Sequence, residues 1–143
     1  MFLAQALTLR KKMEHDIESA IRLISNTSYV AVGEPKPKRN PNEVLGSLNG
    51  MMDDLSALVC RIDEANSKTV LSNGMTIRQA MAKRKVVTYM NAKIAERLGT
   101  FSRKDEHIRI LDADMVSQFN NNNARMWREL DDLIQEANWK TEV

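Results

Sequence analysis

Two stretches of this chain, RIDEANSKT at residues 61–69 and LIQEANWKT at residues 133–141, share Ile, Glu-Ala-Asn and Lys-Thr in the same order. An offset of 72 residues superimposes them. Each stretch ends a long run of apolar residues at helical spacing. The shared phrase therefore marks the same point in two copies of one structural unit.

A second pair of stretches extends the repeat toward the start of the chain. LAQALTLRK at residues 3–11 aligns with IRQAMAKRK at residues 77–85 at an offset of 74. Both members of a helix pair therefore recur in order, which predicts a duplicated αα-hairpin with units near 1–69 and 75–141. A repeated start also indicates that the first residues form a structural helix rather than a targeting peptide.

Apolar residues at alternating steps of four and three define a seam in each predicted helix. The second helix shows the seam without interruption, at Val44, Leu48, Met51, Leu55, Leu58, Ile62 and Ala65. The third helix, from Ile77 to Leu98, carries Arg84 and Asn91 at seam positions. The pattern predicts an all-α fold of four long helices, arranged as an antiparallel, coiled-coil-like bundle in a single domain over residues 1–143.

Local signals predict where the helices begin. Asn40 suits an N-cap and Pro41 the first helical position. An Asn-Gly pair at residues 73–74 predicts a tight turn, and Thr76 with Gln79 has the spacing of a capping box.

The fourth helix is predicted to begin after a longer connector. Gly99 is expected to stop the third helix, and residues 108–111 to hold a short extended piece. Asp112 or Asp114 is expected to cap the fourth helix. The asparagines at 120–123 are either a weak turn of that helix or a polar seam layer that specifies an oligomer through hydrogen bonds.

Composition and charge set the class of protein. The chain has 143 residues, 43% of them hydrophobic and 28% charged, with a formal net charge of +2. This balance gives no bulk electrostatic signal for a nucleic acid or a membrane, and no apolar run reaches the roughly 18 residues of a membrane span. The lone cysteine, Cys60, is expected to be a small core or near-core residue and fits a reducing compartment, hence the cytoplasm.

The closing IQEANWKTEV, the opening LAQALTLR, the turn NGMTIRQAMAKR and the connector FSRKDEHIR resemble the septicolysin-like family of small, mostly bacterial proteins. The resemblance runs nearly from end to end, and EANWKTEV is its most specific part. It implies a helical protein. The biochemical role of that family is not established, so the resemblance implies no catalytic residue.

Known chemical motifs are absent from the sequence. There is no Glu-x-x-His pair for a di-iron bundle, no phosphate-binding loop, and too few Cys and His for structural zinc. We therefore predict no metal and no cofactor. A Cys60 nucleophile with His15 or His107 has no pattern to support it. Basic clusters at 10–12, 36–39 and 83–85 lack interleaved aromatic residues and are expected to be solvated helix faces rather than an RNA surface.

Arg10 and Arg84 occupy matching seam positions where a hydrophobic residue is expected. A charge at a seam is costly unless it is paired. The structural interpretation is that each arginine reaches a carboxylate on a neighbouring helix. The functional interpretation is that the two arginines bind one anionic ligand on a pseudo-twofold axis.

The repeated phrase also suggests how the second and fourth helices end. Asn tolerates the left-handed conformation, so Asn66 and Asn138 are expected at or just beyond a helix end. Trp139 is expected to anchor the tail by packing rather than to serve as a ligand platform.

Two glutamates in the phrase, Glu64 and Glu136, lie near the negative ends of helix dipoles. We expect at least one of them to contact Arg10, Arg84 or a backbone amide at the start of another helix. The candidate ligand-binding residues are therefore Arg10, Arg84, Glu64, Glu136, Asn138 and Trp139.

The sequence as a whole favours a non-enzymatic, oligomer-forming scaffold or interaction protein. Long apolar seams in a slender chain leave stripes that one bundle does not cover, and such stripes favour a homo-oligomer. The alternative is a small anionic-ligand binding protein or enzyme with a polar pocket near Arg10 and Arg84. RNA binding through the basic clusters is a weaker alternative.

Overall fold

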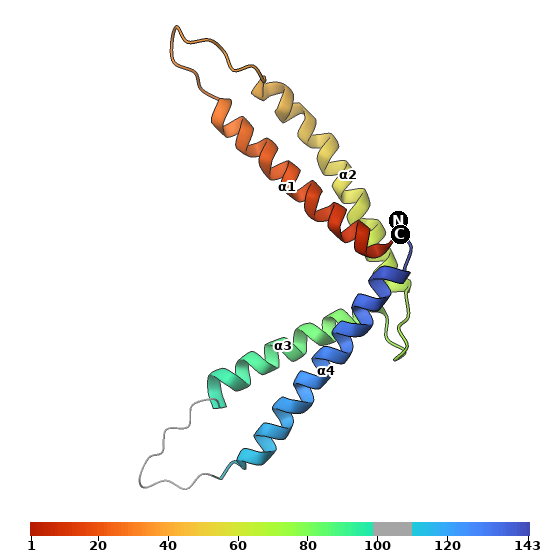
Figure 1. Ribbon diagram of the computed structural model, residues 1–143. Coiled ribbons are helices and arrows are strands. Elements are labelled where there is room, and N and C mark those ends of the chain that lie inside the picture. The colour runs from red at the N-terminus through yellow and green to blue at the C-terminus, as the bar shows by residue number, and fades with distance from the viewer. Residues whose placement is uncertain (99–109) are drawn as a thin grey trace, which may run out of the picture. The chain divides into compact units, whose positions relative to one another are not determined.

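The computed structural model describes residues 1–98 and 110–143, and this part of the chain is all-α and contains no strand. The helices are α1 (Leu3–Thr27), α2 (Pro41–Lys68), α3 (Ile77–Leu98) and α4 (Ala113–Lys140). α1 and α2 run side by side as one antiparallel hairpin, and α3 and α4 form a second (Figure 1). The prediction of four long helices in two hairpins is confirmed.

The chain divides into two compact units. The first contains Met1–Ala65 together with Lys140–Val143, and the second contains Asn66–Trp139. The α1–α2 hairpin therefore includes the last four residues of the chain, while the second unit is built on the α3–α4 hairpin.

The predicted helix starts at α2 and α4 are confirmed by side-chain caps. The Oδ1 atom of Asn40 accepts the backbone N–H of Asn42 at 2.9 Å, with Pro41 as the first helical residue. At α4, Asp112 is the capping residue of the two candidates, because its Oδ1 accepts the N–H of Asp114 at 2.8 Å. Each cap satisfies an amide that has no partner within its own helix.

The start of α3 carries the predicted capping box. The Gln79 N–H donates to the Thr76 hydroxyl at 3.2 Å, and the Thr76 N–H donates to Oε1 of Gln79 at 2.9 Å. The turn before it places Gly74 at φ +82°, a conformation that glycine adopts without strain. In that turn the Met75 N–H donates to Oδ1 of Asn73 at 3.1 Å.

Backbone hydrogen bonds join the end of α2 to the start of α3. The Ile77 N–H donates to the Thr69 carbonyl at 3.0 Å, and the Leu71 N–H donates to the Met75 carbonyl at 2.8 Å. Between these bonds Val70 and Thr76 form an isolated antiparallel bridge. We call residues 69–77 the internal junction.

In the first unit, the two ends of the chain form hydrogen bonds that match those of the internal junction. The Leu3 N–H donates to the Thr141 carbonyl at 2.8 Å, and the Val143 N–H donates to the Met1 carbonyl at 2.8 Å. Phe2 and Glu142 form the antiparallel bridge between them. We call this the terminal junction.

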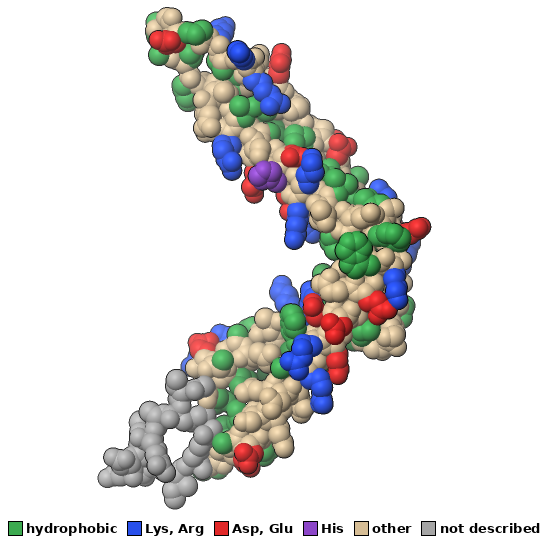
Figure 2. Space-filling model, viewed as in Figure 1, with side chains coloured by type: hydrophobic (Ala, Val, Ile, Leu, Met, Phe, Trp, Pro, Cys, Tyr) green, Lys and Arg blue, Asp and Glu red, His purple; other side chains and the backbone are tan. Residues whose placement is uncertain are grey.

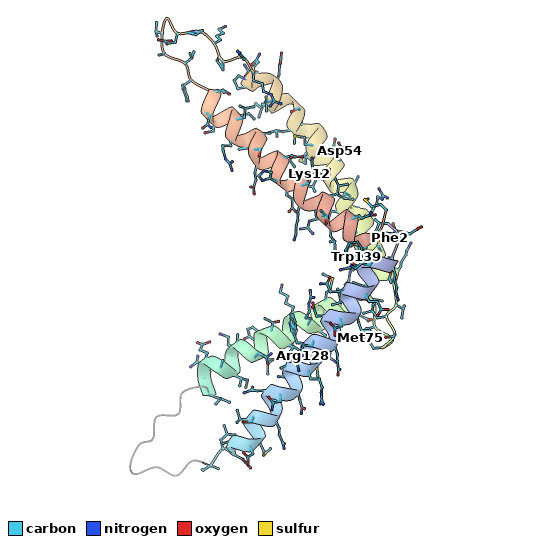
Figure 3. All side chains as sticks on the ribbon, viewed as in Figure 1. Phe2, Lys12, Asp54, Met75, Arg128 and Trp139 are labelled. Carbon is cyan, nitrogen blue, oxygen red and sulfur yellow. The ribbon has the colours of Figure 1, made fainter. Side chains whose placement is uncertain are left out.

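The side chains next to the two junctions also correspond. The Phe2 N–H donates to Oε1 of Gln5 at 2.8 Å, as the Thr76 N–H does to Gln79. Figure 3 labels Phe2 just before α1 and Met75 just before α3. The offsets of 72 and 74 read from the sequence therefore match residues with the same hydrogen bonds.

The junctions correct one prediction. α2 continues two residues past Asn66 and α4 two residues past Asn138, and no described residue other than glycine has a positive φ. The chain leaves each helix toward a bridge, where the carbonyl of Thr69 or Thr141 accepts an amide from the start of another helix. This tertiary hydrogen bond replaces the left-handed stop that the asparagines suggested.

The core of each hairpin sits at its junction end. Leu3 and Ala6 of α1 are fully buried, as are the matching Ile77 and Ala80 of α3. The other buried residues of the described core are mostly at the ends of α2 and α4, and they include Leu58, Ile62, Leu130, Ile134 and Ala137. At their junction ends the two repeats therefore bury several equivalent positions, such as Leu58 with Leu130 and Ile62 with Ile134.

Other expectations fall outside this core or outside the described residues. Cys60 is exposed, so the expectation of a core cysteine is wrong; it lies two residues after the seam residue Leu58 and faces away from the seam. The predicted stop at Gly99 and most of the extended piece at 108–111 lie outside the described residues. Ile110 and Leu111 belong to no strand.

Candidate functional site

A polar cluster that joins the two helices of the α3–α4 hairpin surrounds Arg84. Its Nη1 pairs with Oδ1 of Asp131 on α4, and both side chains are only 26% exposed. The guanidinium carbon lies 6.0 Å from the centroid of the Trp127 ring. The indole Nε1 of Trp127 donates to the Thr88 hydroxyl at 3.0 Å, which ties α4 to α3 a second time.

Arg10, the matching residue of the first repeat, has a different partner. Its Nε donates to Oε1 of Glu14 at 2.8 Å, four residues along the same helix, and both side chains are more than 40% exposed. Glu14 corresponds to Thr88 at the offset of 74, and Val59 corresponds to Asp131 at the offset of 72. In the first repeat, α2 therefore has Val59 where α4 has Asp131, and the carboxylate that pairs with Arg10 is Glu14 of α1 itself.

The structural interpretation of the two arginines is thus confirmed for Arg84, which reaches a carboxylate on a neighbouring helix, and wrong for Arg10. Sequence reasoning missed Asp131, Trp127 and Thr88. The alignment of the repeats could have pointed to Asp131, because Asp131 in the second repeat corresponds to Val59 in the first, although Arg84 and Arg10 correspond to each other.

A hollow beside Arg84 is lined by Met81, Ala82, Arg84, Lys85, Thr88 and Trp127. Its aromatic ring and nearby cations are groups that suit an anionic, planar ligand. However, the guanidinium is already neutralised by Asp131. Arg10 belongs to the first unit and Arg84 to the second.

The remaining candidate residues come from the repeated phrase. Asn138 is buried, with 8% of its surface exposed, whereas Trp139 is 64% exposed. The expectation that Trp139 packs as an anchor is therefore wrong: it directly follows the buried Asn138, and adjacent residues of a helix point in different directions. Glu64 and Glu136 both have interaction partners, while Arg10 and Arg84 form their ion pairs with other carboxylates.

A second polar feature of the α3–α4 hairpin is a layer of asparagines in its seam. Asn91 on α3 and Asn120 on α4 line the same cavity of about 170 Å³, together with the apolar residues Ile94, Leu98 and Val116. The Oδ1 atom of Asn91 is buried, and no donor in the described part of the chain lies within hydrogen-bond distance. Residues 120–123 are helical, so the asparagine run does not break α4.

The first repeat has no such layer. Ile17 stands at the position that matches Asn91, and Leu48 at the position that matches Asn120. The two hairpins share their junction ends but differ in the chemistry of their seams: the α1–α2 seam is apolar at these positions and the α3–α4 seam carries amides. We call the half-buried Asn91 and the exposed Asn120, which line this cavity, the amide layer.

Residues 1–98 and 110–143 bring no three His, Cys, Asp or Glu side chains together in a way that could hold a metal ion. Within the same residues, no helix is both long and apolar enough to cross a membrane.

Comparison with known proteins places the chain in a family. No curated protein matches it. The crystal structure of a functionally unknown conserved protein from Corynebacterium diphtheriae is similar, with a TM-score of 0.80 and 29% sequence identity over 100% of this chain and 98% of that one. Residues 10–143 match the model of a family of unknown function, DUF6847, and the chain therefore belongs to that family.

Proposed function

We propose that this chain is a non-enzymatic, oligomer-forming interaction protein, in which helices of a second copy cover the half-open seams of its hairpins. The observation that carries the proposal is the burial pattern. Away from the junction end, Val44 is the buried seam residue of the first hairpin. The other apolar seam residues there are only half-buried: Met13, Ile17, Ala20, Ile24, Leu48, Met51 and Leu55. Two helices alone cover only one side of each other's apolar stripe, so a further layer of helices would complete the core.

An exposed apolar stripe on α2 supports the proposal. Leu45, Met52 and Val59 follow one another at seven-residue spacing and therefore share one side of the helix. They are 56%, 58% and 38% exposed. Figure 2 shows apolar side chains at the surface of both hairpins. Exposed apolar residues aligned on one side of a helix are typical of interaction surfaces.

The size of a hairpin face is sufficient for a stable interface. The 25 residues of α1 make a helix about 38 Å long, and two packed helices are about 20 Å wide. One face therefore offers roughly 750 Å², close to the roughly 800 Å² per partner that a stable interface buries.

The other expectations are part of the same proposal. We infer that the septicolysin-like proteins, with which the chain shares its EANWKTEV ending, are its wider relatives, and that the protein works in the cytoplasm, where a lone cysteine stays reduced. Binding of a small anion beside Arg84 is less favoured, because Asp131 already neutralises that side chain.

The experiment is sedimentation velocity and light scattering on the full chain between about 1 and 200 µM. We expect a discrete species whose mass is a multiple of 16.3 kDa. Met52→Lys places a charge in the exposed stripe and should shift the species toward the monomer, with an unchanged helical circular dichroism spectrum. Ala57→Lys, on the far side of α2, is the matched control and should keep the assembly.

A parent protein that is monomeric at every concentration would overturn the proposal. So would a Met52→Lys variant that assembles as tightly as Ala57→Lys.

A further inference from the structure

The amide layer of the α3–α4 hairpin is a polar site whose hydrogen bonds are incomplete within the described chain. The Oδ1 atom of Asn91 is buried and has no donor, although Asn120 lines the same cavity. A buried acceptor without a donor is destabilising, because its hydrogen bond to water is lost and not replaced. The rest of the cavity lining, Ile94, Leu98 and Val116 among it, is apolar and offers no side-chain donor.

We propose that the amide layer selects the partner of the α3–α4 hairpin, and that this partner is the same hairpin of a second copy. The inference rests on the proposed oligomer and specifies which surfaces meet. A carboxamide is both donor and acceptor, so an amide layer is self-complementary across a twofold axis. Asn91 is half-buried and Asn120 exposed, so the cavity that they line opens to the surface, and an asparagine of the second copy enters it to donate the N–H₂ group that Asn91 lacks.

The first hairpin does not offer this complement. At the matching level its seam presents Ile17 and Leu48, which would cover Asn91 without donating a hydrogen bond. Buried asparagines in coiled coils fix register and oligomeric state in this way, at a cost in stability. The difference between the two seams therefore favours pairing of like hairpins over pairing of unlike ones.

Charge on the two helices indicates how the like hairpins meet. α3 has six bases and one acid, a net charge of +5, whereas α4 has five acids and three bases, a net charge of −2. A twofold axis parallel to the helices sets α3 of one copy beside α4 of the other. This arrangement juxtaposes opposite charges, keeps neighbouring helices antiparallel and brings the two amide layers to one level.

The test replaces Asn91 in the full chain by the residue of the first repeat. In Asn91→Ile an apolar side chain replaces the amide that fixes the partner at a cost in stability, so we expect a higher melting temperature but a change in stoichiometry, or a mixture of species, in sedimentation velocity. Asn121→Ile is the matched control. Asn121 is exposed beside the layer on α4, and the control should keep the stoichiometry of the parent.

A second pair of variants guards against an uninformative result from the first. Asn91→Asp places one carboxylate from each copy in the same layer, where they repel, and should weaken association at pH 7 at least tenfold. Asn121→Asp should leave the dissociation constant within about twofold of the parent.

The outcomes separate this inference from the proposed function. If the parent is an oligomer and both Asn91 variants keep its stoichiometry and dissociation constant, water fills the cavity and the partner-selection role is overturned. If the parent is monomeric at every concentration, the proposed function itself fails. A change confined to the Asn91 variants supports the inference.

Discussion

The ion pair between Arg84 and Asp131 should stabilise the α3–α4 hairpin more than the pair between Arg10 and Glu14 stabilises the α1–α2 hairpin. Each side chain of the first pair is 26% exposed and the pair joins two helices, whereas the second pair is more than 40% exposed and lies within one helix. A charged hydrogen bond of low exposure contributes about 1.5–3 kcal/mol, an exposed pair within a helix about 0.3–0.5 kcal/mol.

We discount the first value for the quarter of each side chain that remains in water, and expect a coupling energy of about 1–2 kcal/mol. The measurement is a double-mutant cycle on the free energy of unfolding, with Arg84→Met, Asp131→Ala and the double variant. Both tryptophans of the chain, Trp127 and Trp139, belong to the second unit, so fluorescence during urea unfolding reports on this hairpin.

The matched cycle uses Arg10→Met and Glu14→Ala, followed by circular dichroism at the same protein concentration. We expect a coupling energy below about 0.5 kcal/mol there. If the two cycles give equal coupling energies, the bond between helices does not carry the stability that its burial indicates, and the reasoning is refuted.

Four further changes test the fold. Gly46→Ala should stabilise α2 by about 0.5–1 kcal/mol, whereas Gly74→Ala should destabilise the folded protein by about 1 kcal/mol. Both sites have room for a methyl group, but of the two only Gly74 has a positive φ. Thermal unfolding should show melting temperatures that shift in opposite directions. Leu3→Ala should cost about 2–5 kcal/mol in urea unfolding, since Leu3 is fully buried; a loss below 1 kcal/mol would contradict the placement of the core. A circular permutant that links Val143 to Met1 through a three-residue turn and opens the chain at Gly74 should keep the parent's helical spectrum, because the terminal junction reproduces the internal one; an unfolded permutant would show that the correspondence is only geometric.

The parts of the fold that depend on local chemistry could be predicted from the sequence. The cap at Asn40, the turn at Gly74 and the box of Thr76 with Gln79 each involve residues within four positions of one another. Their hydrogen bonds form as the helix forms and need no tertiary partner.

The ends of α2 and α4 could not be predicted in this way. Asn66 has the residue type of a helix stop, but α2 runs two residues further, and just beyond its end the Thr69 carbonyl accepts the amide of Ile77. That bond is visible only once the two helices are placed together, so the tertiary contact overrides the local preference.

In the candidate site, too, the sequence predicted the local feature but not the tertiary contact. A seam position was enough to single out Arg84, but not to choose its partner, because the heptad pattern places residues on a face without stating which side chains meet. Aligning Asp131 with Val59 would have separated Arg84 from Arg10. Cys60 was assigned to the core from the apolar run around it, although the seam steps already passed through Leu58 and Ile62 on either side.

The position of the core implies a gradient of local opening along each hairpin. Helix ends usually exchange their amide protons fastest, because the first amides have no partner within the helix. Here the first amides of α1 and α3, at Leu3 and Ile77, are bonded to carbonyls and belong to fully buried residues. Hydrogen exchange should therefore be slow at Leu3 and Ile77 and become faster toward the far ends of α1 and α3. Each hairpin would open from its tip while its junction stays closed.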